Sequence, residues 1–166
     1  QTDAEGHRYI QFDGTDDFLQ SAAGVFPDAL TEIWFAAAVD TSDPTVRNIP
    51  IAVSNGGYSG SDRWAFIDLN VLGNTQFRIN AATSGDVKVT SVAADPVIIH
   101  GYWDGSALFM RVNGAQVDIA AFASAPVLLD QELDVGALDN NGSVVVQSPI
   151  RLYGLIIRDK APSAEE

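Results

Sequence analysis

The sequence predicts an all-β domain built as an antiparallel sandwich or barrel. Polar and apolar residues alternate with a period of two along most of the chain, and β-branched and aromatic residues gather in short runs. Gly, Asn, Asp and Pro separate these runs at intervals of about 8 to 12 residues, which is typical of short antiparallel strands. No run before Ala161 carries the apolar spacing of a helix.

Thirteen runs carry this strand pattern, and turn-forming residues bound them. They cover residues 9–13, 18–22, 32–39, 49–54, 63–69, 75–80, 86–92, 96–103, 107–113, 115–120, 131–137, 143–147 and 150–159. Trp34 and Trp103 fall within such runs, and we assign both to the core. Burial of a ring of this size contributes about 2 to 3 kcal/mol, which explains both residues without a ligand.

Two turn signals place three of these strands beside one another. Asn113-Gly114 separates "LFMRV" from "AQVDI" and is typical of a type I′ hairpin turn, in which both central residues adopt positive φ. Asp104-Gly105 carries the same signal between "IIHGYW" and "SALFMRV". Residues 97–120 are therefore expected to form a three-stranded meander.

Length and composition limit the classes of function. The 166 residues suit a single domain over 1–166, and the absence of cysteine excludes disulfides, thiolate metal sites and a cysteine nucleophile. The net charge of −13 is spread along the chain, so a nucleic-acid backbone would be repelled. The longest apolar run, Ile33–Val39, is far shorter than the about 20 residues of a membrane-spanning helix, so no membrane insertion is expected.

Both ends of the sequence suggest a segment of a longer protein. The chain begins at Gln1 rather than Met, and "APSAEE" places a proline and acidic residues where the first turn of a helix would begin. We therefore expect other domains or subunits of a larger assembly as partners.

Three segments carry a family resemblance in a characteristic order. The opening "YIQFDGTDDFLQSA", the meander, and "LDVGALDNNG" followed by "IRLYGLIIRDKAPSAEE" resemble the laminin-G-like, concanavalin A-like lectin/glucanase superfamily. The resemblance implies a two-sheet antiparallel jelly-roll sandwich. It also implies a non-catalytic, lectin-like module that binds a glycan or cell-surface polysaccharide and belongs to an extracellular or virion surface protein.

The setting implied by the resemblance leaves two functions open. "TDAEGHRYIQFDGTDDFLQ" is similar to modules in bacteriophage and prophage structural proteins. Such a module could recognise a cell-surface glycan. The alternative is a structural decoration or spacer domain of a phage particle or surface array that binds no sugar.

Catalysis is not expected at the strand motif of this superfamily. Its glucanases carry Glu-x-Asp followed two or three residues later by a second Glu. Here Glu132 and Asp134 share one strand face, but Gly136 and Ala137 stand in place of the second Glu. A retaining glycosidase needs two carboxyl groups about 5 Å apart. The two histidines lie in no nucleophile motif, so we expect a protein that is not an enzyme.

The stretch "FDGTDDF" has two open interpretations. Asp13, Asp16 and Asp17 offer three carboxylates, and Ca²⁺ takes oxygens from carboxylates, carbonyls and water. The stretch does not match the EF-hand pattern, and Asp side chains also cap their own backbone in ordinary turns. If a structural calcium ion is bound, the resemblance implies a further oxygen from the end of the chain, and Asp159 in "IIRDK" is the candidate.

Two loops are candidates for glycan contacts. The loop "SNGGYSGSDRW" carries Tyr58, Arg63 and Trp64 among small residues, so an aromatic ring can stack on a sugar while polar groups take the hydroxyls. The loop "LDNNGS" offers further polar side chains, namely Asp139, Asn140 and Asn141. Trp64 also fits a strand and "DNNG" an ordinary turn. The net charge predicts a neutral or weakly charged saccharide.

Overall fold

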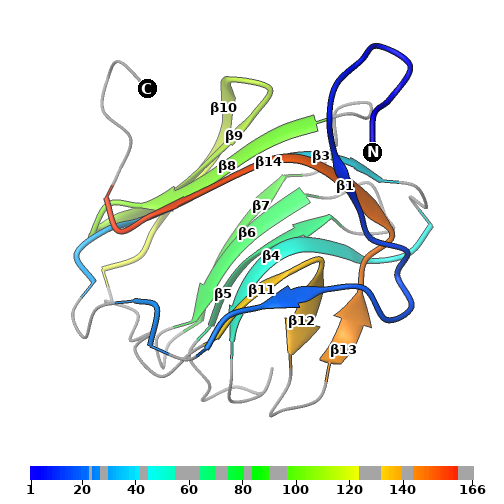
Figure 1. Cartoon of the computed structure of the whole chain (residues 1–166). Coiled ribbons are helices and arrows are strands. Elements are labelled where there is room, and N and C mark those ends of the chain that lie inside the picture. The colour runs from blue at the N-terminus through cyan, green and yellow to red at the C-terminus, as the bar shows by residue number, and fades with distance from the viewer. Residues whose placement is uncertain are drawn as a thin grey trace.

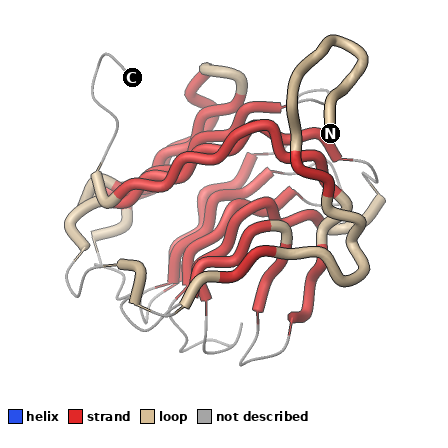
Figure 2. The backbone as a smooth tube through the Cα atoms, in the orientation of Figure 1, coloured by secondary structure: helices blue, strands red, loops and turns tan. Residues whose placement is uncertain are grey.

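The computed structural model describes residues 1–22, 24–26, 30–41, 45–54, 64–69, 75–80, 84–89, 97–123, 132–139 and 144–160. These ranges form fourteen strands and contain no helix, and hence no helix long and apolar enough to cross a membrane. Most strands lie in two antiparallel sheets that face each other (Figures 1 and 2). The predicted antiparallel sandwich is confirmed.

The upper sheet of Figure 1 has six strands with β3 near its centre. Its order is β1 (Ile10–Gln11), β14 (Ile150–Arg158), β3 (Ile33–Thr41), β8 (Val97–Trp103), β9 (Ala107–Val112) and β10 (Ala115–Ala121). β3 pairs along its length with β14 on one side and β8 on the other, so Phe35 lies opposite both Ile157 and Gly101. The first and last strands of the chain are therefore neighbours.

The lower sheet also has six strands. Its order is β2 (Leu19–Gln20), β11 (Glu132–Val135), β4 (Asn48–Ser54), β5 (Trp64–Leu69), β6 (Thr75–Asn80) and β7 (Ser84–Val89). A separate pair, β12 (Ala137–Asp139) and β13 (Val144–Gln147), packs Leu138 and Val146 against Ile49 and Ala52 of β4. This pair covers part of the lower sheet.

The strand predicted over 131–137 is divided at Gly136. Its φ of 78° lies in the left-handed region, which lets the chain leave the lower sheet after β11. A Cβ at this position would lie 2.7 Å from a ring carbon of Phe12. The prediction of one continuous strand was wrong because an isolated glycine does not interrupt a period-two pattern.

The core lies between the two sheets. Phe35 on β3, Phe77 on β6 and Ile99 on β8 all turn inward and are fully buried. Phe77 lies against Gly101, where a Cβ atom would be only 2.3 Å from its ring. Trp103 is buried in the same core, and its indole N–H donates to the carbonyl of Phe122 at 2.7 Å, as a buried Trp requires.

The burial predicted for Trp34 is confirmed, but its ring lies outside the cluster between the two sheets. Because Ile33 and Phe35 face inward, Trp34 must face the outer side of the upper sheet. It is nevertheless only 3% exposed, since its ring lies 5.8 Å from that of His100 and 5.2 Å from the guanidinium of Arg158. The assignment of Trp103 to the core is confirmed.

One of the two predicted hairpin turns is confirmed and one is corrected. Asn113 and Gly114 have φ values of 50° and 82°, as a type I′ turn requires. At the second hairpin Gly105 has a positive φ and Asp104 does not. There the carboxylate of Asp104 accepts the N–H groups of Ser106 and Ala107, both at 2.9 Å, and closes a longer loop.

Substitution of Gly101 tests the contact between the sheets. We expect Gly101→Ala to lower the free energy of unfolding by about 1 to 3 kcal/mol, because the new methyl group overlaps the ring of Phe77. Gly154→Ala is the matched control: it is a strand glycine whose Cβ would meet nothing within 4 Å. Denaturant unfolding measures both, and equal stabilities of the two variants would contradict the proposed overlap.

Candidate functional site

A groove of about 1000 Å³ lies over the outer face of the upper sheet. Residues 1–9 form a loop that rises above this sheet and is closed by a bridge between Thr2 and Arg8 (Figure 1). We call these residues the N-terminal loop and the space beneath them the outer groove. The loop lines it with Asp3, Glu5, His7 and Arg8, and the sheet lines it with Ala38, Asp40, Val97, Ile98, Asn113, Arg151 and Tyr153.

Arg151 organises the sheet side of the outer groove. Its Nη1 atom lies 3.2 Å from the carboxylate of Asp40, and its Nε–H donates to the side-chain oxygen of Gln11 at 3.3 Å. The guanidinium also lies 5.4 Å from the ring centre of Tyr9. Burial acts to lower the pKa of Arg151, but Tyr9 and Asp40 outweigh it and the pKa is raised. These contacts hold a charged donor and an acceptor side by side.

Tyr153 supplies an aromatic ring at the same place. The pairing of β14 with β3 shifts between Leu152 and Gly154, so Tyr153 occupies a bulge, which redirects its side chain. Its ring lies 5.6 Å from Tyr9 and 6.4 Å from the imidazole of His7. Burial and the charges of Asp3 and Asp40 raise the pKa of Tyr153, so its phenol stays a neutral hydrogen-bond donor.

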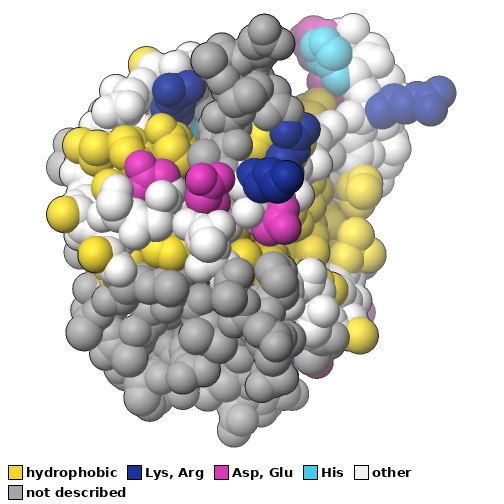
Figure 3. Space-filling view, turned by 90° about the vertical axis from the view of Figure 1, so that its left-hand side faces the viewer, with side chains coloured by type: hydrophobic (Ala, Val, Ile, Leu, Met, Phe, Trp, Pro, Cys, Tyr) yellow, Lys and Arg dark blue, Asp and Glu magenta, His cyan; other side chains and the backbone are white. Residues whose placement is uncertain are grey.

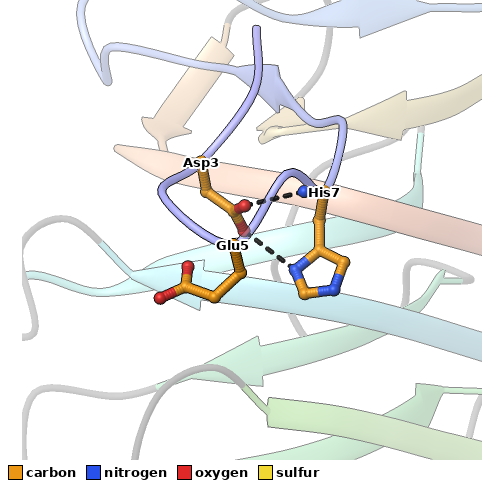
Figure 4. A group of neighbouring side chains, drawn as sticks. All are labelled: Asp3, Glu5 and His7. Atoms are coloured by element: carbon orange, nitrogen blue, oxygen red, sulfur yellow. Dashed lines mark hydrogen bonds and ion pairs between the residues drawn. The ribbon is translucent and has the colours of Figure 1, made fainter.

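The loop side of the groove carries Asp3, Glu5 and His7 (Figure 4). Asp3 accepts the backbone N–H of His7 at 2.7 Å, and its second oxygen lies 3.2 Å from the ring Nδ1. Ligand atoms of the three residues lie within 4.8 Å of one another, so this group of described residues could hold a metal ion. A histidine with two carboxylates suits a transition metal better than calcium. The contacts between Asp3 and His7 close the loop, and this alone explains why the three side chains lie together.

The structure does not bring together the four aspartates predicted as calcium ligands. Asp13 accepts the N–H groups of Thr15 and Asp16 at 2.7 and 3.4 Å, which is an ordinary turn capped by its own side chain. Asp16 and Asp17 are exposed. This turn lies beside the start of β14, whereas Asp159 follows its end, about 26 Å away along nine strand residues. These carboxylates do not fit one calcium site.

Most residues predicted to contact a glycan lie outside the described residues. This applies to Tyr58, Arg63, Asn140 and Asn141. Trp64 begins β5 and Asp139 ends β12, and only their backbones are described. The two predicted loops therefore stay a prediction.

The acidic pair of β11 lies on the outer face of the lower sheet, because Leu133 and Val135 turn inward. Asp134 is fully buried, and one of its oxygens accepts the side-chain N–H of Gln20 at 2.9 Å. Glu132 is half-buried. The chain then leaves the sheet at Gly136, so the second Glu of the glucanase motif has no counterpart on this strand.

No family model and no curated protein sequence matches this chain. Solved structures do match. The CBM40 of the Ruminococcus gnavus IT-sialidase, bound to α2,3-sialyllactose, is 13% identical with a TM-score of 0.68. The match covers 94% of this chain and 94% of that one. Mouse laminin α1 domains LG4-5 are 14% identical with a TM-score of 0.69; the match covers 96% of this chain and 45% of that one.

A third match is the NanB sialidase of Streptococcus pneumoniae, 12% identical with a TM-score of 0.74. It covers 93% of this chain but 26% of the sialidase, so the chain spans about a quarter of that protein. The fold is a concanavalin A-like jelly roll. At these identities the likeness establishes the fold alone, and it confirms that part of the resemblance seen in the sequence.

The outer groove was not predicted from the sequence. Its side chains come from segments far apart in the sequence: Asp3 and His7 lie near the start of the chain, Asp40 and Ile98 in its middle, and Tyr153 near its end. The one local signal is the spacing of Asp3 and His7, which suits an acceptor that closes a short loop. The pairing of β1 with β14 then places this loop above the sheet.

Acid should open the N-terminal loop through Asp3. Burial acts to raise its pKa, but the hydrogen bonds from His7 outweigh it and the pKa is lowered from 3.8. A carboxylate whose pKa is lowered by folding stabilises the folded loop above its unfolded-state pKa. This stabilisation is lost as pH falls through the folded-state pKa. We expect the His7 amide to lose protection from hydrogen exchange below about pH 4. Asp3→Asn should abolish this step and the control Glu5→Gln should keep it; an acid step retained in Asp3→Asn would refute the assignment.

Proposed function

We propose that the protein is a non-catalytic carbohydrate-binding module and that the outer groove holds the sugar. One observation carries this proposal: Tyr153 places an aromatic ring among Asp3, Asp40 and Arg151 in the same groove. Sugars bind to such sites because their C–H faces stack on rings while carboxylates and guanidinium groups take the hydroxyls. The sialyllactose named with the CBM40 structure is a ligand of that protein and supports only the class of function.

The remaining residues of the groove fit this role. The ion pair of Arg151 and Asp40 is solvated, so each partner can exchange part of its hydrogen bonding for a hydroxyl group at little cost. Asn113 uses its side-chain oxygen to accept the N–H of Ile98, which leaves its amide hydrogens available to a ligand. Ile98 is itself 49% exposed and provides an apolar floor for the C–H groups of a sugar.

We further propose that the two predicted loops, which connect β4 with β5 and β12 with β13, make glycan contacts of their own, and that the preferred saccharide is neutral or weakly charged. The loop residues concerned are Tyr58, Arg63, Trp64, Asp139, Asn140 and Asn141. The resemblance of the opening sequence supports a setting in an extracellular or virion surface protein, as one part of a larger assembly. Sequencing of the parent gene tests this setting, since flanking tail, capsid or enzyme domains would identify it.

Glycan binding should depend on Tyr153. We expect a glycan array to identify a saccharide whose affinity falls about tenfold in Tyr153→Ala, because the stacked ring is lost. Tyr102→Ala is the matched control: it removes a tyrosine from the same sheet that stacks on Phe109 at 4.5 Å and does not line the groove. Titration calorimetry measures both. An array without hits would instead support a decoration or spacer domain, and equal losses in both variants would move the site elsewhere.

Thermal unfolding with and without calcium tests the calcium hypothesis. If the turn around Asp13, Asp16 and Asp17 binds Ca²⁺, calcium at a hundred times the dissociation constant should stabilise the protein by about 2.7 kcal/mol. The melting temperature in EDTA and in excess calcium measures this, with Asp16→Asn as the variant and Asp118→Asn, on β10, as the control. An unchanged melting temperature leaves the stretch as the turn that the hydrogen bonds of Asp13 describe.

A further inference from the structure

The upper sheet has an open edge along β14. This nine-residue strand pairs with β3 from Ile150 to Arg158, but it pairs with β1 only at Arg151 and Leu152. Within the described part of the chain, residues 153–158 therefore have no strand neighbour on that side, and Figure 1 shows β14 along the front of the sheet with β1 at one end only. Every second residue of such an edge presents an unpaired N–H and C=O group.

Two apolar cavities follow one another beside this edge. The first, of about 450 Å³, is lined by Leu152, Gly154 and Leu155 of β14 together with Leu19 and Val135 of the lower sheet. The second, of about 340 Å³, is lined by Ile157, Arg158 and Asp159 and, across the gap, by further apolar side chains: Val25, Phe26 and Leu133. We call the two together the edge groove, because both lie between the open edges of the two sheets.

The floor of the edge groove belongs to the core. Leu133, Leu155 and Ile157 are only partly buried, although all three pack against the main hydrophobic cluster. Four of the eight exposed large hydrophobic residues of the described chain also border this edge: Ile10 (52%), Leu19 (53%), Val25 (47%) and Ile156 (43%). In Figure 3 hydrophobic side chains reach the surface on the right-hand side of the view, below the N-terminal loop. An apolar surface of this kind marks an interaction site.

The charge at the two ends of the edge groove is basic. Arg8 lines the first cavity, while Arg158 and Asp159 line the second and Lys160 follows them in the chain. Neither Arg8 nor Lys160 forms an ion pair with any residue in the described ranges, although the chain carries a net charge of −13. Each end of the open edge thus carries a net positive charge, because Asp159 offsets only one of the two basic residues beside it.

We propose that the edge groove binds an extended acidic segment of a partner polypeptide, which adds as a strand beside residues 153–158. The unpaired main-chain groups of β14 would bond its backbone, alternate apolar side chains would enter the two cavities, and flanking carboxylates would meet Arg8 and Lys160. The six residues span about 20 Å, which is the usual length of an edge strand. A second copy of this chain fits less well, because it would add another net charge of −13 and a second basic edge.

The edge groove and the proposed sugar site occupy different places on the molecule. The outer groove lies on the face of the upper sheet, whereas the edge groove lies between the two sheets. Arg8 and Tyr153 border both. Glycan titration of every variant used below therefore shows whether one site fails while the other is retained.

Synthetic peptides test the strand addition on the full 166-residue chain. The probe is a peptide of about eight residues in which valine and threonine alternate, with two glutamates at either end. Its matched control carries lysines in place of the glutamates, and a third peptide has proline at alternate positions, which removes main-chain donors. We expect the glutamate peptide to bind in fluorescence anisotropy and to slow hydrogen exchange in residues 153–158, the lysine peptide to bind about tenfold more weakly, and the proline peptide not to bind.

Charge reversal tests the ends of the groove. We expect the double variant Arg8→Glu and Lys160→Glu to bind the glutamate peptide about tenfold more weakly and to prefer the lysine peptide. Arg111→Glu on β9 is the control and should change neither. Absence of protection in residues 153–158 at about 1 mM glutamate peptide overturns the proposal. Equal binding of the two charged peptides overturns the acidic occupant, and a dimer in ultracentrifugation that the double variant abolishes would make a second copy the occupant.

Discussion

The contact of Phe77 with Gly101 fixes how the two sheets meet. Phe77 comes from β6 in the lower sheet and occupies the space that a side chain on β8 would fill in the upper sheet. Its ring also meets that of Phe35 edge-on, with centres 5.9 Å apart. Once these inward positions are fixed, period-two alternation assigns Asp40 and Ile98 to the outer face. The geometry of the outer groove thus depends on a contact on the opposite side of the same sheet.

The outer face of the upper sheet is divided into two parts with different chemistry. At one end, pairing of five strands aligns Arg158, Trp34, Tyr102, Phe109 and Ile119 in one row. The rings of Tyr102 and Phe109 stack within 5° of parallel, so this end is mainly aromatic. The other end carries the polar groove.

Periodicity predicted the strands and turn chemistry predicted one hairpin, because both depend on residues that are close in sequence. The break at Gly136 and the outward position of Trp34 were missed, since both depend on which face of a strand meets the other sheet. The outer groove could not be predicted for a related reason. Arg151 reaches Gln11 and Asp40 across sequence separations of 140 and 111 residues, and alternation along a strand carries no information on such pairings.

The chain has a high net negative charge, but the local charge at each proposed site differs from it and suits the proposed ligand. In the outer groove Arg151 is matched by Asp40, so the sheet side is close to neutral and a neutral sugar loses little hydration of charge on binding. Arg8 and Lys160 have no such match in the described ranges, and they stand about 20 Å apart along β14, more than twice the Debye length of about 8 Å at physiological salt. Each therefore acts as a separate local attraction. A long polyanion would meet the repulsion of the whole chain, whereas a short segment with carboxylates at its ends meets the net positive charge at either end of β14.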